Sequence, residues 1–324
     1  MIKAPQARAA APASAQRRAE LAHARGAALA RLIVGDPGSL PLLMGVVNVT
    51  PDSFSDGGRF LKLDAALEHA QELVTQGAQI LDVGGYSTRP GADDVCPEEE
   101  AARVLPVIEA LARELPQVVL SVDTFRAEVA RQAVEAGAGI VNDVTGGNDP
   151  LMHATVARLR VERGPLAGGH PVYVCQHMRG TPQTMDSLAS YGDVVAQVGQ
   201  ELSAQAAKFV AAGGQEERLV LDPGIGFSKD AEQSWRLLAQ LGRLLELGYP
   251  LLVGTSRKRL LGAALGAADQ GAAGRDVATA VTTALAGAAG AWAVRVHNVA
   301  FSADARAVAA AWGAAGGNVG HQIR

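Results

Sequence analysis

Cysteine is scarce in this 324-residue sequence: Cys96 and Cys175 stand far apart and form no CxxC pair. Disulfide and zinc frameworks are therefore unsupported, and a reducing compartment, the cytoplasm, is expected. No apolar run approaches the roughly 18 residues that span a bilayer, so we expect no membrane partner. A net charge of -4 gives no general attraction to nucleic acid either.

The sequence also lacks the short motifs of several enzyme classes. No G-x-G-x-x-G follows the first apolar run, which speaks against an open dinucleotide-binding sheet. No H-x-H, H-E-x-x-H or D-x-D spacing is present, so a metal site built only from protein ligands is disfavoured.

Residues 1–38 differ in composition from the rest, and we predict that they form an extension ahead of a domain over 39–324. Residues 1–34 are rich in alanine and arginine, with Glu20 as their only acid. This bias is typical of an organellar transit peptide, which would place the protein in mitochondria. The favoured interpretation is a leader or linker, followed by a short helix packed beneath the domain.

From residue 41 onward, short apolar runs alternate with longer amphipathic segments. The expected strands are 42–47, 78–84, 118–123, 138–143, 172–176, 218–222, 251–256 and 293–297. They are rich in β-branched residues and bounded by glycine or proline, as buried parallel strands are. Helical patterns follow at 63–77, 97–115 and 125–138, where Gly77 and Gly137 suit helix ends. Eight alternations predict a (β/α)8 TIM barrel.

Polar residues fall where these strands end. Asn48, Asp123, Asn142, His177, Asp222, Ser256 with Lys258, and Arg295 with His297 occupy such positions. Taken singly, each would suit a turn or a helix N-cap. A barrel, however, gathers the carboxyl ends of its strands on one face, where its active site lies. The sequence therefore predicts that these residues meet at one mouth.

Two acids, an amide and a lysine suggest a frame for a flat heterocycle. A carboxylate, here Asp123 or Asp222, accepts two parallel N–H donors from an amino group beside a ring N–H. Asn142 both donates and accepts. Lys258 supplies a cation for an exocyclic carbonyl oxygen. A pterin or a purine fits this set.

A second group is suited to an anion. The run "TSRKRLLG" (255–262) places Ser256 and Lys258 where the seventh strand meets an expected helix. Arg295 and His297 stand two apart in the eighth strand, so their side chains project to the same side. A phosphate site after strands seven and eight is frequent in barrels.

Two polar loops, "NVTPDSFSDGGRF" and "YSTRPGADDV", follow the first two strands. Neither has the apolar spacing of a core helix, and we predict that they are mobile lids that close over substrate. Asn48, at the root of the first loop, can offer an oxygen to Mg²⁺, which keeps most of its water when a diphosphate supplies other ligands.

At these residues the chain resembles dihydropteroate synthase. The matching segments include "MGVVNVTPDSFSDGG", "ILDVGGYSTRPGA", "LDPGIGF", "GTSRK" and "RVH", in the family's order over roughly residues 43 to 300. The resemblance implies condensation of 6-hydroxymethyl-7,8-dihydropterin diphosphate with 4-aminobenzoate, which yields 7,8-dihydropteroate and diphosphate. It also implies a homodimer.

The resemblance further implies a role for each matched residue. Pterin contacts fall on Asp123, Asn142, Asp222 and Lys258. Diphosphate and Mg²⁺ fall to Asn48, Arg295 and His297, with help from Arg89. The aminobenzoate ring is expected near Phe54, Thr88, Pro90 and Phe227, and its carboxylate is expected to face Ser256 and the helix start at Arg259. Asp123, Lys258, Arg295 and His297 are the expected catalytic residues.

Three positions depart from the pattern that bacterial members often show: Tyr86 stands for Glu, Gln176 for Met and Ser228 for Gly. Two other functions share part of the frame. A pterin-dependent methyltransferase would keep the acids and the amide but would not need "STRPGA", "SRK" and "RVH". A catalytically silent pterin-binding barrel would be expected to lose Asn48, Lys258, Arg295 or His297, and all four are present.

Overall fold

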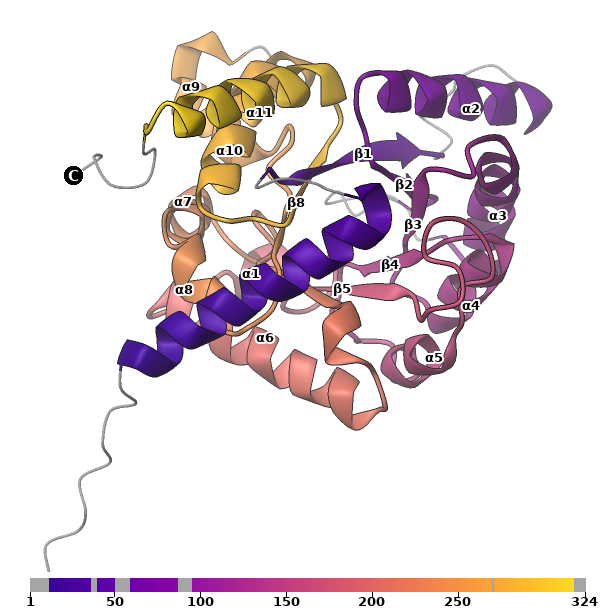
Figure 1. Ribbon diagram of the computed structural model, residues 1–324, viewed down its shortest axis with the longest axis horizontal. Coiled ribbons are helices and arrows are strands. Elements are labelled where there is room, and N and C mark those ends of the chain that lie inside the picture. The colour runs from indigo at the N-terminus through magenta and orange to yellow at the C-terminus, as the bar shows by residue number, and fades with distance from the viewer. Residues whose placement is uncertain (1–11, 36–39, 50–58, 87–94, 270, 318–324) are drawn as a thin grey trace, which may run out of the picture.

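The computed structural model describes residues 12–35, 40–49, 59–86, 95–269 and 271–317. Its eight strands are all parallel, and each is followed along the chain by helix (Figure 1). The strands are β1 (Leu42–Asn48), β2 (Ile80–Gly84), β3 (Val119–Asp123), β4 (Ile140–Asp143), β5 (Val172–Gln176), β6 (Leu219–Asp222), β7 (Leu252–Val253) and β8 (Ala293–Val296).

The helices surround these strands (Figure 1). They are α1 (Pro12–Val34), α2 (Arg59–Thr75), α3 (Pro97–Glu114), α4 (Ala127–Ala136), α5 (Met152–Arg158), α6 (Val194–Ala211), α7 (Ala231–Ala239), α8 (Leu241–Leu245), α9 (Arg259–Leu265), α10 (Asp276–Ala288) and α11 (Val299–Ala314). Gly77 and Gly137 have φ values of 105° and 129°, in the region where glycine is favoured, and they follow α2 and α4 as expected.

The sheet closes on itself. Hydrogen-bonded neighbours run in the order β6-β5-β4-β3-β2-β1-β8-β7. A parallel bridge from Leu221 to Leu251 joins the two ends, and the Leu221 amide donates to the Pro250 carbonyl at 2.9 Å. The predicted (β/α)8 TIM barrel is thereby confirmed. The expected seventh strand, 251–256, was too long: β7 has two residues because the chain leaves the sheet at Gly254 and turns at Ser256 and Arg257, where Arg257 has a φ of 61°.

Strand register decides which side chains share the interior. Asp82 of β2 is aligned with Ser121 of β3, and Asp123 is aligned with Asn142 of β4. Residues aligned in neighbouring strands point to the same face, as do residues two apart along one strand. The side chains of Asp82, Asp123, Asn142 and Arg295 contact one another within the barrel.

The other end of the barrel, where the strands begin, is closed by α1, which runs across it in Figure 1. Ala22, Leu29 and Ile33 of this helix are buried in the same core as the strands. Arg25 donates to the Gly248 carbonyl at 2.8 Å and pairs with Glu216, just before β6. The helix is longer than the short one expected, and whether residues 1–38 form a separate extension stays a prediction.

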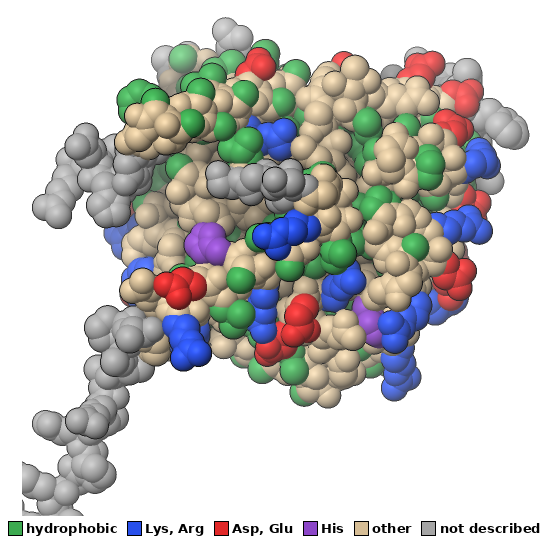
Figure 2. Space-filling model, viewed as in Figure 1, with side chains coloured by type: hydrophobic (Ala, Val, Ile, Leu, Met, Phe, Trp, Pro, Cys, Tyr) green, Lys and Arg blue, Asp and Glu red, His purple; other side chains and the backbone are tan. Residues whose placement is uncertain are grey.

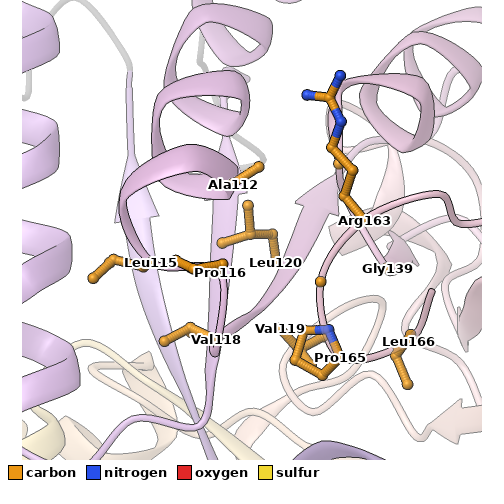
Figure 3. Close-up of a pocket in the computed structure, with 12 residues that line it drawn as sticks. Ala112, Leu115, Pro116, Val118, Val119, Leu120, Gly139, Arg163, Pro165 and Leu166 are labelled. Carbon is orange, nitrogen blue, oxygen red and sulfur yellow. The ribbon is translucent and has the colours of Figure 1, made fainter.

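A small hollow lies at the same end, between the start of β3 and segment 158–171 (Figure 3). Its volume is about 10 Å³, which leaves room for no more than about one water molecule. Leu166 and Val161 are buried in the core, so this segment is anchored to the barrel. The hollow is too small to bind a substrate.

Surface charge and helix length add two observations. On the face shown in Figure 2, basic and acidic side chains are interspersed. Within the described part of the chain, no helix combines the length and apolarity that crossing a membrane would require.

Candidate active site

A cavity of about 1050 Å³ opens at the carboxyl ends of the strands. That volume is ample for two small organic molecules. Of the residues predicted to form the site, nine line it: Asn48, Asp123, Asn142, Asp222, Phe227, Ser256, Lys258, Arg295 and His297. Residues separated by about 250 positions in sequence therefore meet at one mouth, as predicted from the strand ends.

Four predicted residues, Phe54, Thr88, Arg89 and Pro90, lie outside the described residues. They belong to the two loops that we expected to act as lids.

Arg295 lies between two carboxylates. Its Nε donates to Asp82 Oδ2 and its Nη2 to Asp123 Oδ2, each at 2.6 Å. Asp82 Oδ2 also accepts from Asn142 Nδ2 at 3.1 Å. The sequence assigned Arg295 to an anion alone, but this cation also compensates two acids, Asp82 and Asp123.

The protonation of Asp123 is strongly affected by its surroundings. Burial raises its pKa to about 7, while the charge of Arg295 lowers the pKa and that of Asp82 raises it. Burial raises the pKa of Asp222 too, opposed by Lys258 and by a hydrogen bond from the Gly224 amide at 2.7 Å. Acids with such perturbed pKa values in a cleft are typical of functional sites.

Lys258 lies among glycines that leave room for it. A Cβ on Gly226 would stand 3.4 Å from its Cδ, and a Cβ on Gly254 would stand 3.8 Å from its Nζ. The ammonium is 4.6 Å from the centre of the Phe227 ring and donates to the Ile225 carbonyl. Burial lowers its pKa to about 8, opposed by the charge of Asp222, so the lysine is mostly protonated at neutral pH.

Ser256 and His297 form a pair at the rim. The serine Oγ lies 2.9 Å from His297 Nδ1 and accepts from the His297 amide at 3.1 Å. Ser256 thus orients the imidazole, and its expected contact with the aminobenzoate carboxylate stays a prediction. Arg259, at the start of α9, is exposed and reaches Asp186 at 3.2 Å.

His177 does not join the mouth, contrary to the prediction. Its ring is buried behind the cavity wall, with Nε2 2.9 Å from Glu201 and Nδ1 2.8 Å from Lys229 Nζ. Burial lowers its pKa to about 4, so it is neutral. Lys229 Nζ also donates to the carbonyls of Gly224 and Phe227, which holds the loop after β6. Both ring nitrogens of His177 are engaged by protein groups, so this histidine is not placed to bind a metal ion in the cavity.

The sequence assigned no role to four further residues of the site. Tyr86, Gln176 and Lys229 line the cavity, and Asp82 supports Arg295 from below. Tyr86 accepts a hydrogen bond from Gln183 at 3.1 Å, and Gln176 donates to the Val144 carbonyl at 3.2 Å. A signal for Asp82 was available: it is the only charged residue of the otherwise apolar strand "ILDVG".

Comparison with known proteins agrees with this geometry. Residues 44–297 match the family model described as pterin binding enzyme. Over 275 residues the chain is 46% identical to the dihydropteroate synthase of Mycobacterium leprae, covering 83% of this chain and 93% of that one. This chain belongs to the dihydropteroate synthase family. Its activity is accordingly that of a transferase, and the methyltransferase and silent-barrel alternatives are set aside.

Solved structures of the family share the fold. One is the Xanthomonas albilineans dihydropteroate synthase with 4-aminobenzoic acid, with a TM-score of 0.76 and 43% identity, covering 86% of this chain and 93% of that chain. Another, of the same enzyme, is in complex with 7,8-dihydropteroate, with a TM-score of 0.73, 41% identity, and coverage of 86% and 94%.

Proposed function

We propose that this chain joins 6-hydroxymethyl-7,8-dihydropterin diphosphate to 4-aminobenzoate, with the site residues in the roles set out below. The observation that carries the proposal is that half-buried Asp123 and buried Asn142 and Asp222 share one cavity with the cations Lys258 and Arg295. Related structures that hold 4-aminobenzoic acid or 7,8-dihydropteroate support the two organic substrates.

The pterin ring is assigned to the floor of the cavity. Asp222 is suited to accept the paired N–H donors of the amino-pyrimidine edge, and Asn142 can meet an edge that mixes donors and acceptors. Asn142 Oδ1 is buried and has no hydrogen-bond partner among the described residues, so it is available to a ligand. Lys258, charged at neutral pH, is placed to meet the carbonyl oxygen of the ring.

The diphosphate is assigned to Asn48, Arg295 and His297. The described residues hold no group of three or more His, Cys, Asp or Glu side chains that could bind a metal ion. The donor set therefore fits Mg²⁺ held through the Asn48 amide oxygen, water and the diphosphate itself, since this ion needs few protein ligands. Bound there, Mg²⁺ would neutralise charge on the leaving group.

The reaction is an exchange of bonds at the pterin methylene carbon. Its C–O bond breaks with the electron pair leaving on diphosphate, and the positive charge left behind is delocalised into the ring, where ionised Asp123 favours it. The aminobenzoate nitrogen then forms the new C–N bond and releases a proton to solvent. No strong base is needed, because an arylamine is neutral at pH 7. Phe227 and the α9 start at Arg259 are the proposed contacts of the aminobenzoate ring and carboxylate.

The test is diphosphate release from the pterin diphosphate, measured with and without 4-aminobenzoate and Mg²⁺. We expect 7,8-dihydropteroate and diphosphate in equal amounts when all components are present. Folded protein that releases no diphosphate under any condition would contradict the proposed function. Turnover unaffected by chelation of Mg²⁺ would remove the ion from the scheme.

We also propose that the chain is a homodimer through α10 and α11. These helices pack side by side (Figure 1), and their outer faces expose Val277 and Val281 of α10 and Val308 and Trp312 of α11. Contiguous apolar surface of this kind marks an interaction site. The wild-type protein should sediment as a dimer of 33.3-kDa chains, and Trp312→Glu should shift it toward monomer. A wild-type monomer at micromolar concentration would contradict this.

The cytoplasm is the proposed compartment. Cys96 and Cys175 are both free thiols, which suits a reducing environment. Fractionation of the native cell would test this, and a mitochondrial location would point instead to a targeting role for residues 1–38.

A further inference from the structure

Asp82 is a buried acid whose contacts all lead to the active site. It sits inside β2 with a fully buried side chain, and it is the only charged residue of that strand. Burying an ionised carboxylate costs several kcal/mol unless strong partners compensate it. The presence of a buried acid at this position therefore calls for a functional explanation.

Its partners are two residues of the proposed substrate frame. A single oxygen, Oδ2, accepts from Arg295 Nε at 2.6 Å and from Asn142 Nδ2 at 3.1 Å. The other oxygen, Oδ1, is buried and has no hydrogen-bond partner among the described residues. Half of the hydrogen-bonding capacity of this carboxylate is thus unused, which is a poor arrangement for stability. It is a good arrangement for fixing one side chain from β8 and one from β4.

The guanidinium of Arg295 is held on two nitrogens. Asp82 takes Nε and Asp123 takes Nη2, whereas Nη1 makes no hydrogen bond to any described residue. Arg295 also lines the cavity. Because both carboxylates bind it, the arginine cannot rotate about its terminal torsions without losing a charge-assisted hydrogen bond.

We propose that Asp82 is a positioning residue for the reaction: from beneath the cavity floor it fixes the guanidinium of Arg295 and the carboxamide of Asn142 toward the substrates. This inference rests on the substrate-binding roles proposed above for Arg295 and Asn142. Asp82 itself touches no substrate.

Asp82 also acts electrostatically on Asp123. The charged groups that face Asp123 come from several elements: Arg295, Asp82, Glu100, Asp143 and Lys258. After burial and Arg295, the negative charge of Asp82 is the next influence, and it raises the pKa of Asp123. Removing that charge should therefore lower the pKa of Asp123, so that Asp123 ionises at a lower pH.

The decisive variant is Asp82→Asn, which keeps the shape and removes the charge. We expect kcat/KM for the pterin diphosphate to fall by about 10²-fold, because a misplaced group near the reacting atoms costs about that much. We also expect the acid limb of the pH profile of kcat/KM to move to lower pH, and the melting temperature to stay close to that of the wild type. A merely structural acid would not move the acid limb.

Ser121→Ala is the matched control. Ser121 is aligned with Asp82 across the sheet, and its Oγ is likewise buried with no hydrogen-bond partner among the described residues. This variant changes the same layer of the barrel without touching Arg295, and its kinetics should equal those of the wild type. Losses in Ser121→Ala equal to those in Asp82→Asn would overturn the proposal. So would an Asp82→Asn enzyme with unchanged kcat/KM, or one with reduced kcat/KM and an unmoved acid limb.

A second variant and a binding measurement complete the test. If Asp82→Asn does not fold, Asp82→Ser is expected to show the same loss and the same displaced limb. Calorimetry with 6-hydroxymethylpterin, which lacks the diphosphate, separates this inference from the proposed function. Wild-type protein that binds this pterin no better than Asp82→Asn does would overturn the positioning role, whereas wild-type protein that fails to release diphosphate in the assay above would overturn the function itself.

Discussion

The two ends of the barrel bury different kinds of side chain. At the end where strands begin, α1 covers the core with Ala22, Leu29 and Ile33, and its half-buried Arg25 meets Glu216 and a carbonyl. At the carboxyl end, Asp82, Asp123 and Asp222 are drawn into the interior beside the cations Arg295 and Lys258.

The side chains at the base stabilise the fold, whereas those at the mouth cost stability and serve the active site. Apolar side chains in α1 gain free energy on burial, about 25 cal/mol per Å² of area removed from water. The acids at the mouth lose hydration, and the raised pKa values of Asp123 and Asp222 reflect that cost. We therefore expect variants at the base to change stability and variants at the mouth to change activity.

Lys258→Ala should have the largest effect. The ammonium donates to the Ile225 carbonyl and lies over the Phe227 ring, contacts that link it to a single loop, so thermal stability should change little. Loss of its charge beside the pterin should lower kcat/KM by about 10³-fold, as removal of one oriented electrostatic group does. Steady-state kinetics would show this, with Lys208→Ala on the exposed face of α6 as the control. Near-normal turnover would contradict the assignment.

Leu29→Ala should show the opposite behaviour. This side chain is 2% exposed beneath the strands, and truncating it should lower the free energy of unfolding by about 2–5 kcal/mol. Turnover per folded molecule should stay at the wild-type value, because α1 lies at the far end from the cavity. Denaturant titration and active-site-normalised kinetics measure the two quantities. Leu32→Ala, at a more exposed position of the same helix, is the matched control, and equal destabilisation by both would argue against packing as the cause.

The pH dependence of kcat/KM should reflect the ionisation of Asp123 and Lys258 at the mouth of the barrel. The pKa of Asp123 is raised to about 7 and that of Lys258 is lowered to about 8. Asp123 is ionised above its pKa, and Lys258 is protonated below its own. Activity should therefore rise tenfold per pH unit below about 7 and fall above about 8. Asp123→Asn should abolish the acid limb of the profile. If an acid limb near pH 7 remained in this variant, the ionisation would belong to another group.

Ser228→Gly should have the smallest effect. Ser228 has a φ of 51°, a conformation that glycine adopts more readily, and many bacterial relatives are expected to carry glycine there. Its Oγ, however, bonds to the amide and carbonyl of Arg179 at 2.9 and 2.8 Å. Relief of the backbone strain and loss of the two hydrogen bonds oppose each other, so the free energy of unfolding should change by less than about 1 kcal/mol. Ser228→Ala keeps the strained backbone and loses both bonds, so its melting temperature should fall further than that of the glycine variant.

The sequence by itself determined the barrel and most of the residues at its mouth. Eight apolar runs set the strands, since buried parallel strands read as continuous apolar segments, and a polar residue at the end of nearly every run marked the carboxyl ends. Asp123, Asn142, Asp222 and Lys258 were found in this way, because their position along each strand also sets their position in space.

Only the tertiary structure decided how these residues pair. His177 ends a strand like the others, yet it turns toward Glu201 and Lys229 behind the wall, because the side of a strand that a residue faces changes at every position. Asp82 lies 213 positions before Arg295 and binds it, a contact that no local pattern encodes. Strand register brings two such residues within hydrogen-bond distance, and register is a property of the closed barrel rather than of any one segment.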